Sequence, residues 1–183
     1  MGLAMSRRSR FSVWLALALA AGYLVVTSWV RWHVDGLIQH AVGRPLPAFR
    51  LVDRAGTVWT ADGLRGKRAV LHFFRSRCHS CDAEAPAMRE LEATLPADVV
   101  LLHVMTDTVL RFPAAESEAT VAAKGFARPV AMADAAFADA FHKSSWSQVT
   151  PITYVVDAQG VVRYGLRGAQ TRAAIEQAIA AAK

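Results

Sequence analysis

The two cysteines of the chain lie close together, in the segment Cys78-His79-Ser80-Cys81. This spacing is found in redox-active dithiols and also at zinc sites. A tetrahedral zinc site needs two further ligands, but the chain has no other cysteine, and its six histidines include no pair at zinc-finger spacing. A disulfide that closes so short a loop removes little chain entropy and stabilises little. The spacing therefore favours redox chemistry over a zinc site or a purely structural disulfide.

The surroundings of Cys78 predict a thiol that ionises easily. The apolar run at residues 69–74 predicts a buried strand, and helical spacing begins after Cys78. Unpaired N–H groups and the positive dipole end at a helix start favour thiolate over thiol, and Arg77 and His79 add positive charge on either side. We therefore expect Cys78 to be the nucleophile, with a lowered pKa, and Cys81 to be the resolving thiol.

Glu84 is the expected proton carrier. It lies three residues after Cys81 and shares a helical stripe with Met88, Leu91 and Leu95. Burial on such a stripe disfavours the charged carboxylate, so Glu84 can hold or accept the proton that Cys81 loses before it attacks. The alternative is an outward-facing glutamate that complements the helix dipole.

The other elements predict an α/β sandwich. Apolar or alternating runs predict strands over residues 49–52, 57–60, 69–74, 99–105, 129–132, 152–156 and 161–166. Helical spacing predicts helices after Cys78 and over residues 113–124, 134–141 and 171–182. The first two strands flank a turn and should form a β-hairpin. The last two strands are joined by a turn too short for a parallel crossover, so the central sheet should be mixed.

The first 44 residues predict a membrane anchor. Residues 11–30 carry no charge, and a helix of that length spans about 30 Å, the thickness of bilayer hydrocarbon. Arg7, Arg8 and Arg10 precede this run, so the positive-inside rule places the N-terminus in the cytoplasm. We expect a cytoplasmic basic segment over residues 1–10, the anchor over 11–30, a tether over 31–44 and one globular domain over 45–183. A cleaved signal peptide is the alternative, although the run is long for one and no clean cleavage site follows.

Composition excludes several classes of function. The chain has 183 residues, of which 54% are hydrophobic and 20% charged, as in one modest folded domain. Its formal net charge is +6, but residues 45–183 hold 16 basic and 14 acidic side chains and lack the basic bias of a nucleic-acid binder. A glycine-rich phosphate loop is also missing from the sequence.

Together these features resemble the thioredoxin superfamily. The Cys-x-x-Cys at a helix start, Pro86 five residues after Cys81, and Thr150-Pro151 before an apolar strand carry the resemblance. With the anchor, the hairpin and Glu84, the chain resembles more narrowly the membrane-tethered group that includes TlpA, ResA, CcmG and ScsD. The resemblance implies a thioredoxin-like three-layer sandwich with a mixed central sheet and an N-terminal β-hairpin. It also implies that Thr150 and Pro151 form a cis-proline loop that docks the substrate backbone; by itself, the sequence shows only a bond whose cis form is accessible.

The chain departs from that family in three respects. The family usually has Trp before the first cysteine and often Pro between the two, whereas this chain has Arg77 and His79-Ser80. A cationic site without proline favours an oxidising couple, because it stabilises the thiolate of the reduced form, although tethered relatives are often reductants. His72 occupies the inner-strand position where thioredoxins carry an acidic residue; we expect a hydrogen-bonded core histidine there rather than a catalyst.

The sequence thus predicts a thiol:disulfide oxidoreductase of the bacterial inner membrane whose catalytic domain faces the periplasm and acts by mixed-disulfide exchange. Its expected partners are protein thiols and disulfides and a membrane or periplasmic redox partner, not nucleic acid. We expect no metal and no cofactor beyond the redox-active Cys78–Cys81 disulfide. The main alternative is a copper-tolerance module in which the two thiolates and His79 hold Cu(I). A purely structural domain is the third interpretation, and the direction of electron flow and the client protein stay open.

Overall fold

The computed structural model describes residues 7–182, with residues 7–10 described by their backbone alone. Residues 1–6 of the expected cytoplasmic segment and Lys183 lie outside the described residues. The chain divides into two compact units, Met1–Asp35 and Gly36–Lys183.

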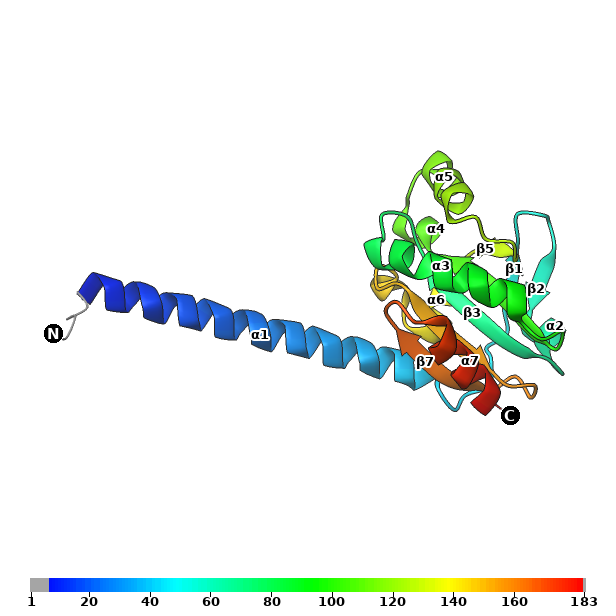
Figure 1. The fold of residues 1–183 in the computed structure, drawn as a ribbon, viewed down its shortest axis with the longest axis horizontal. Helices are drawn as coiled ribbons and strands as arrows, with labels where there is room; N and C mark the ends of the chain where they lie inside the picture. The colour runs from blue at the N-terminus through cyan, green and yellow to red at the C-terminus, as the bar shows by residue number, and fades with distance from the viewer. Residues whose placement is uncertain (1–6, 183) are drawn as a thin grey trace. The chain divides into compact units, whose positions relative to one another are not determined.

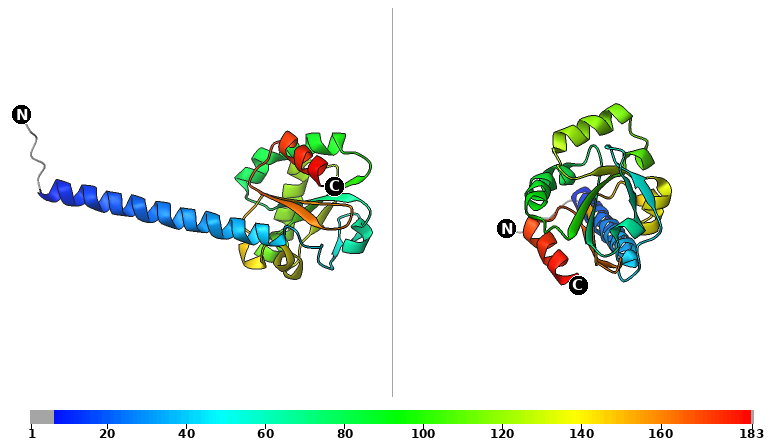
Figure 2. Two further views of the ribbon diagram at one scale, coloured as in Figure 1. Left: turned by 90° about the horizontal axis from the view of Figure 1, so that it is seen from below. Right: turned by 90° about the vertical axis from the view of Figure 1, so that its right-hand side faces the viewer.

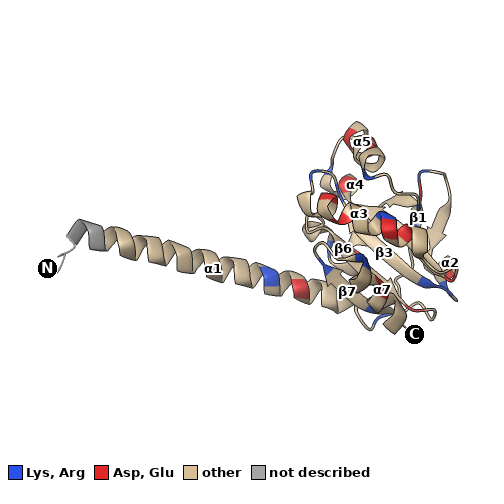
Figure 3. Ribbon diagram, viewed as in Figure 1, with Lys and Arg blue, Asp and Glu red and all other residues tan. Residues whose placement is uncertain are grey.

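The N-terminal unit consists of most of helix α1 (Arg7–Ala41), whose long central part carries no charged residue (Figures 1 and 3). The stretch Phe11–Ala41 is long and apolar enough to cross a membrane, and contains an 18-residue window with a mean hydropathy of 1.9. By length and composition alone, it is a candidate membrane span.

The end of α1 differs from the expected tether over residues 31–44, because the helix continues to Ala41. Gly36 lies inside the helix. A single glycine is tolerated there at a cost of about 1 kcal/mol. Burial of Ile38, which is 1% exposed and packs against the bare backbone of Gly165, offsets that cost. The last turn of the helix is thus part of the globular unit.

A five-stranded sheet of order β5-β4-β3-β6-β7 forms the centre of this unit (Figure 1). Its pairs β3–β4 and β4–β5 are parallel, whereas β3–β6 and β6–β7 are antiparallel, which confirms the mixed sheet. The strands are β3 (Arg68–Phe74), β4 (Val99–Met105), β5 (Val130–Met132), β6 (Ile152–Val156) and β7 (Val162–Arg167). A separate antiparallel hairpin, as expected, pairs β1 (Arg50–Val52) with β2 (Val58–Thr60).

Helices cover both faces of the central sheet (Figure 2). Helices α3 and α7 pack on one face through a core that includes Val70, Met88, Leu91, Val155 and Ile175. Helix α6 covers the other face, where its phenylalanines pack against Phe73 and Tyr154. The helices are α2 (Ala61–Leu64), α3 (His79–Thr94), α4 (Asp107–Leu110), α5 (Ala114–Lys124), α6 (Ala135–Phe141), the 3-10 turn η1 (Ser144–Trp146) and α7 (Arg172–Ala181). The result is the expected three-layer, thioredoxin-like sandwich.

Candidate active site

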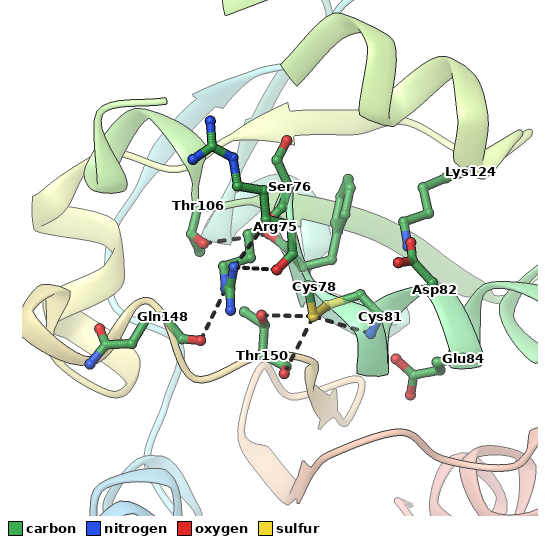
Figure 4. Close-up of a disulfide and its surroundings, with 12 residues drawn as sticks. Arg75, Ser76, Cys78, Cys81, Asp82, Glu84, Thr106, Lys124, Gln148 and Thr150 are labelled. Carbon is green, nitrogen blue, oxygen red and sulfur yellow. Dashed lines mark hydrogen bonds and ion pairs between the residues drawn. A yellow bond between two sulfur atoms is a disulfide. The ribbon is translucent and has the colours of Figure 1, made fainter. Parts of the chain in front are cut away.

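A disulfide joins Cys78 and Cys81 where the buried strand β3 gives way to α3 (Figure 4). Cys78 is the N-cap residue of the helix, and its Sγ accepts a hydrogen bond of 3.1 Å from the backbone N–H of Cys81. The sulfur thus occupies the place where a capping oxygen usually satisfies a free N–H group of the first turn. Cys78 is 5% exposed and Cys81 1%, so Cys78 is the more accessible cysteine.

The loop before β6 supplies a second hydrogen-bond donor to the same sulfur. The Thr150 hydroxyl donates to Cys78 Sγ over 3.3 Å, and the peptide bond from Thr150 to Pro151 is cis. The Thr150 carbonyl oxygen lies 3.6 Å from this sulfur. Arg75 holds the two segments together, since its guanidinium donates to the carbonyl oxygens of Gln148, Ser76 and Arg77 (Figure 4). Residues separated by 72 positions in the sequence therefore meet at Cys78.

These contacts indicate what the reduced site can do. A thiolate at Cys78 would face the Cys81 N–H, the Thr150 hydroxyl and the positive end of the α3 dipole. Hydrogen bonds to an ionised acceptor are about twice as strong as those to a neutral one. The arrangement therefore stabilises the thiolate relative to the thiol, mainly through neutral donors.

Arg77, which precedes Cys78, is paired with an acidic residue of another helix. Its guanidinium forms a bidentate ion pair with Glu116 of α5, with two hydrogen bonds of 2.6 Å each. The guanidinium carbon also lies 5.0 Å from the centroid of the Phe112 ring. The hydrogen bonds from Arg77 lower the pKa of Glu116. The carboxylate of Glu116 thereby offsets part of the positive field of Arg77 at Cys78. His79, the first residue of α3, has an exposed side chain.

A buried polar cluster holds the turn that precedes Cys78, and sequence reasoning missed it. Asp107, fully buried at the start of α4, accepts hydrogen bonds from the backbone and hydroxyl of Ser76 and from the hydroxyl of Ser117. The Ser76 hydroxyl also contacts that of Thr120. Polar residues scattered over three segments show no periodic signal in a sequence. The cluster connects the end of β3 with α4 and α5 and so fixes the backbone that presents the disulfide.

Glu84 is buried on the inner face of α3, one turn after Cys81 (Figure 4). Residues three apart on a helix lie on the same face, so its carboxylate and Cys81 are neighbours. In this disulfide form both carboxylate oxygens have partners. His72 Nε2 lies 3.0 Å from Oε2, and the backbone N–H of Gln170 donates to Oε1 over 2.9 Å.

The hydrogen bonds continue from Glu84 through the core of the protein. Nδ1 of His72 lies 2.8 Å from Nδ1 of His103, and Nε2 of His103 lies 2.7 Å from Glu92 Oε1. His72 and His103 are register partners on the parallel strands β3 and β4, a pairing that local sequence patterns do not specify. Glu92 lies eight residues after Glu84, on the same face of α3, and its place among the stripe residues Met88, Leu91 and Leu95 is a signal that could have found it.

Burial and hydrogen bonding set the charges of Glu92 and His103, the two residues of this hydrogen-bonded network that lie farther from Cys81. Burial opposes ionisation of Glu92, but hydrogen bonds from His103 and from the backbone N–H groups of Ala127 and Arg128 outweigh it and lower the pKa of Glu92. Burial lowers the pKa of His103 to about 4. At neutral pH, Glu92 is therefore an anion and His103 a neutral imidazole.

Metal ligands do not gather in the described part of the chain. Among residues 7–182, no group of three or more His, Cys, Asp or Glu side chains could hold a metal ion. In the disulfide form the sulfurs are also not thiolates, which are the ligands that Cu(I) prefers.

The mixed sheet, the flanking helices and the disulfide at the start of α3 define a thioredoxin-like protein. The chain belongs to the AhpC/TSA family, which matches residues 42–165. No curated protein is similar enough in sequence to count as a match.

Several solved structures share the fold. A thiol:disulfide interchange protein of the thioredoxin family from Chlorobium tepidum TLS is 22% identical, with a TM-score of 0.62 over 75% of this chain and 94% of that one. StoA from Bacillus subtilis is 18% identical, with a TM-score of 0.61 over 73% and 96% of the two chains. DsbF from MTB, solved in mixed oxidized and reduced forms, is 21% identical, with a TM-score of 0.61 over 74% and 96%.

Proposed function

We propose that this protein is a thiol:disulfide oxidoreductase that exchanges disulfides with protein substrates through Cys78 and Cys81. The observation that carries the proposal is the pair of hydrogen-bond donors, from Cys81 N–H and Thr150 Oγ1, that meet at Cys78 Sγ. An inert structural disulfide has no need of donors placed to stabilise one of its sulfurs as an anion. The names of the structural neighbours, among them a thiol:disulfide interchange protein, support the same activity.

The reaction follows from the two environments of the sulfurs. In the reduced enzyme, the Cys78 thiolate attacks a substrate disulfide, forms a mixed disulfide and releases one substrate thiolate. Cys81 then loses its proton and attacks Cys78 Sγ, which releases the second substrate thiolate and leaves the Cys78–Cys81 disulfide. The enzyme dithiol loses two electrons and the substrate disulfide gains them. The reverse sequence oxidises a substrate dithiol.

The remaining site residues have separate proposed roles. Glu84, buried one turn from Cys81, handles the proton of the resolving thiol. Thr150 and Pro151 present a backbone edge to the bound substrate segment beside Cys78. Arg77 and His79 contribute only a modest positive field, since Arg77 is paired with Glu116.

We also propose that α1 anchors the protein in the inner membrane with its catalytic domain in the periplasm, where it meets client proteins and a redox partner. The uncharged run within Phe11–Ala41 supports the anchor, and the arginines that precede it support a cytoplasmic N-terminus. Disulfide exchange is useful in that compartment, because thiols are kept reduced in the cytosol. An alkaline phosphatase fusion to the C-terminus should be active; an inactive fusion would contradict this orientation.

Trapping of mixed disulfides tests the catalytic assignment. Cys81→Ser should accumulate a covalent complex with a model disulfide substrate, because no resolving thiol remains, and Cys78→Ser should form none. Both variants remove one sulfur of the same disulfide, so each is a matched control for the other. Equal exchange by Cys78→Ser and the unmodified protein would refute the assignment.

A further inference from the structure

The hydrogen bonds that connect Glu84, His72, His103 and Glu92 require a fixed number of protons. It contains three contacts, Glu84–His72, His72–His103 and His103–Glu92, at 3.0, 2.8 and 2.7 Å. Each contact at such a distance needs one proton between two acceptor atoms. Two ionised carboxylates and two neutral imidazoles bring only two protons. The disulfide form therefore holds a third.

The position of the third proton follows from the charge of Glu92, at the end of the network away from Cys81. Glu92 is an anion that accepts from the backbone N–H groups of Ala127 and Arg128, so His103 must donate through Nε2. A neutral His103 then has an accepting Nδ1, and His72 must donate to it. The remaining proton lies between His72 Nε2 and Glu84 Oε2. The third proton is therefore held at the Glu84 end of the network, beside Cys81.

Other ionisable groups around the chain leave this proton in place. Arg128 donates from its guanidinium to the carbonyl oxygen of Glu92, at the far end. On the outer side of α3, Lys124 is paired with Asp82 at 2.6 Å. From α3 itself, Cys81 faces the Glu84 end of the network. The rings of Phe74 and Phe126 pack against His72 and are not titratable.

We propose that Glu84, His72, His103 and Glu92 form a buried proton store that is filled when Cys78 and Cys81 are disulfide-bonded and that gives one proton to Cys81 when the disulfide opens. The inference rests on the proposed role of Glu84 and extends it. His72 and His103 are positioning residues, because they touch Glu84 and each other rather than the reacting sulfurs. The store spares Cys81 from exchanging its proton with bulk water through the core.

The proton balance follows the exchange reaction in both directions. When a substrate thiolate attacks Cys78 Sγ, the electron pair of the Cys78–Cys81 bond moves to Cys81 Sγ, which takes a proton from Glu84. The network of four side chains then holds two protons. When Cys81 later resolves a mixed disulfide, its proton returns to Glu84 before its sulfur attacks Cys78, and the chain again holds three.

A rapid-mixing experiment separates this store from the rest of the mechanism. Reduced full-length protein is mixed with Ellman's disulfide reagent, which releases one coloured thiolate when Cys78 attacks and a second when Cys81 resolves. His72→Gln can still donate a hydrogen bond to Glu84 but cannot take up a proton. We expect it to slow the second phase at neutral pH by about tenfold, a modest share of a general acid–base effect. The first phase should stay within about twofold of the original rate.

Two further variants make the result specific. His142→Gln is the matched control, because His142 is another buried histidine, whose Nδ1 faces Tyr154 rather than this chain; it should alter neither phase. The second phase of His72→Gln should also become steeper with pH, which a merely structural defect would not cause. An unchanged second phase in folded His72→Gln would refute the store. If Glu84→Gln alone slows that phase, the role of Glu84 stands without the store, and if the unmodified protein shows neither phase, the proposed function fails.

A measurement on the unmodified protein keeps the proposal testable if His72→Gln does not fold. The ring nitrogens of His72 report their protonation and their hydrogen bonds through their NMR chemical shifts. These shifts should differ between the disulfide and dithiol forms, because one proton leaves the chain on reduction. Identical chemical shifts of His72 Nε2 in both redox forms would overturn the inference.

Discussion

Replacing Thr150 with valine removes one of the two donors that face Cys78 Sγ, with little change in side-chain shape. The Thr150 hydroxyl lies 3.3 Å from the sulfur. A hydrogen bond to a charged acceptor contributes about 1.5–3 kcal/mol, and the partial exposure of this contact places it near the lower end, about 1.5 kcal/mol. The bond favours the thiolate over the thiol, so its loss should raise the pKa of Cys78. At pH values below that pKa, the thiolate population should fall about tenfold.

The assay is a pH titration of the ultraviolet thiolate absorbance in a Cys81→Ala background, where Cys78 is the sole thiol. Thr153→Val is the matched control, because Thr153 is 1% exposed and its hydroxyl has no hydrogen-bond partner in the described structure. Arg77→Asn should move the titration less than Thr150→Val, because Arg77 is already paired. Coincident titrations of Thr150→Val and the parent would refute the reasoning that neutral donors stabilise this thiolate.

Three further predictions concern stability. Asp107→Asn should lower the free energy of unfolding by about 1–3 kcal/mol, because the buried hydroxyl of Ser76 loses an ionised acceptor; an unchanged denaturant midpoint would contradict this. Gly165→Val should cost about 1–3 kcal/mol, because even a Cβ at this position would lie 2.6 Å from Ile38 Cγ2; calorimetry that shows no loss would refute the close packing. Burial lowers the pKa of His142 from 6.5 to about 4, so the unfolded chain binds this proton first as the pH falls. Up to about 3 kcal/mol of stability should be lost between pH 6.5 and 4, and His142→Gln should remove that part of the pH dependence measured by urea unfolding.

Local patterns were sufficient for most of the fold. Residues 69–74 and 99–105 were expected as buried strands, and β3 and β4 occupy these positions to within one residue. An apolar run bounded by turn residues predicts a buried strand from local sequence alone, without knowledge of the distant residues that pack against it. The end of α1 is different, because the sequence predicts a tether over residues 31–44, whereas the burial of Ile38 against Gly165 keeps the helix intact to Ala41.

The pair Cys78 and Cys81, its helix-start position and the inward face of Glu84 were determined by the sequence alone, because neighbours within one helix are set by the helical repeat. Only the tertiary structure decided that Arg77 is paired with Glu116 of α5. It likewise decided that His72 and His103 meet between two strands, since strand register depends on the packing of the whole sheet. Contacts between segments distant in sequence thus determined the electrostatics of a site whose reactive atoms local spacing had already identified.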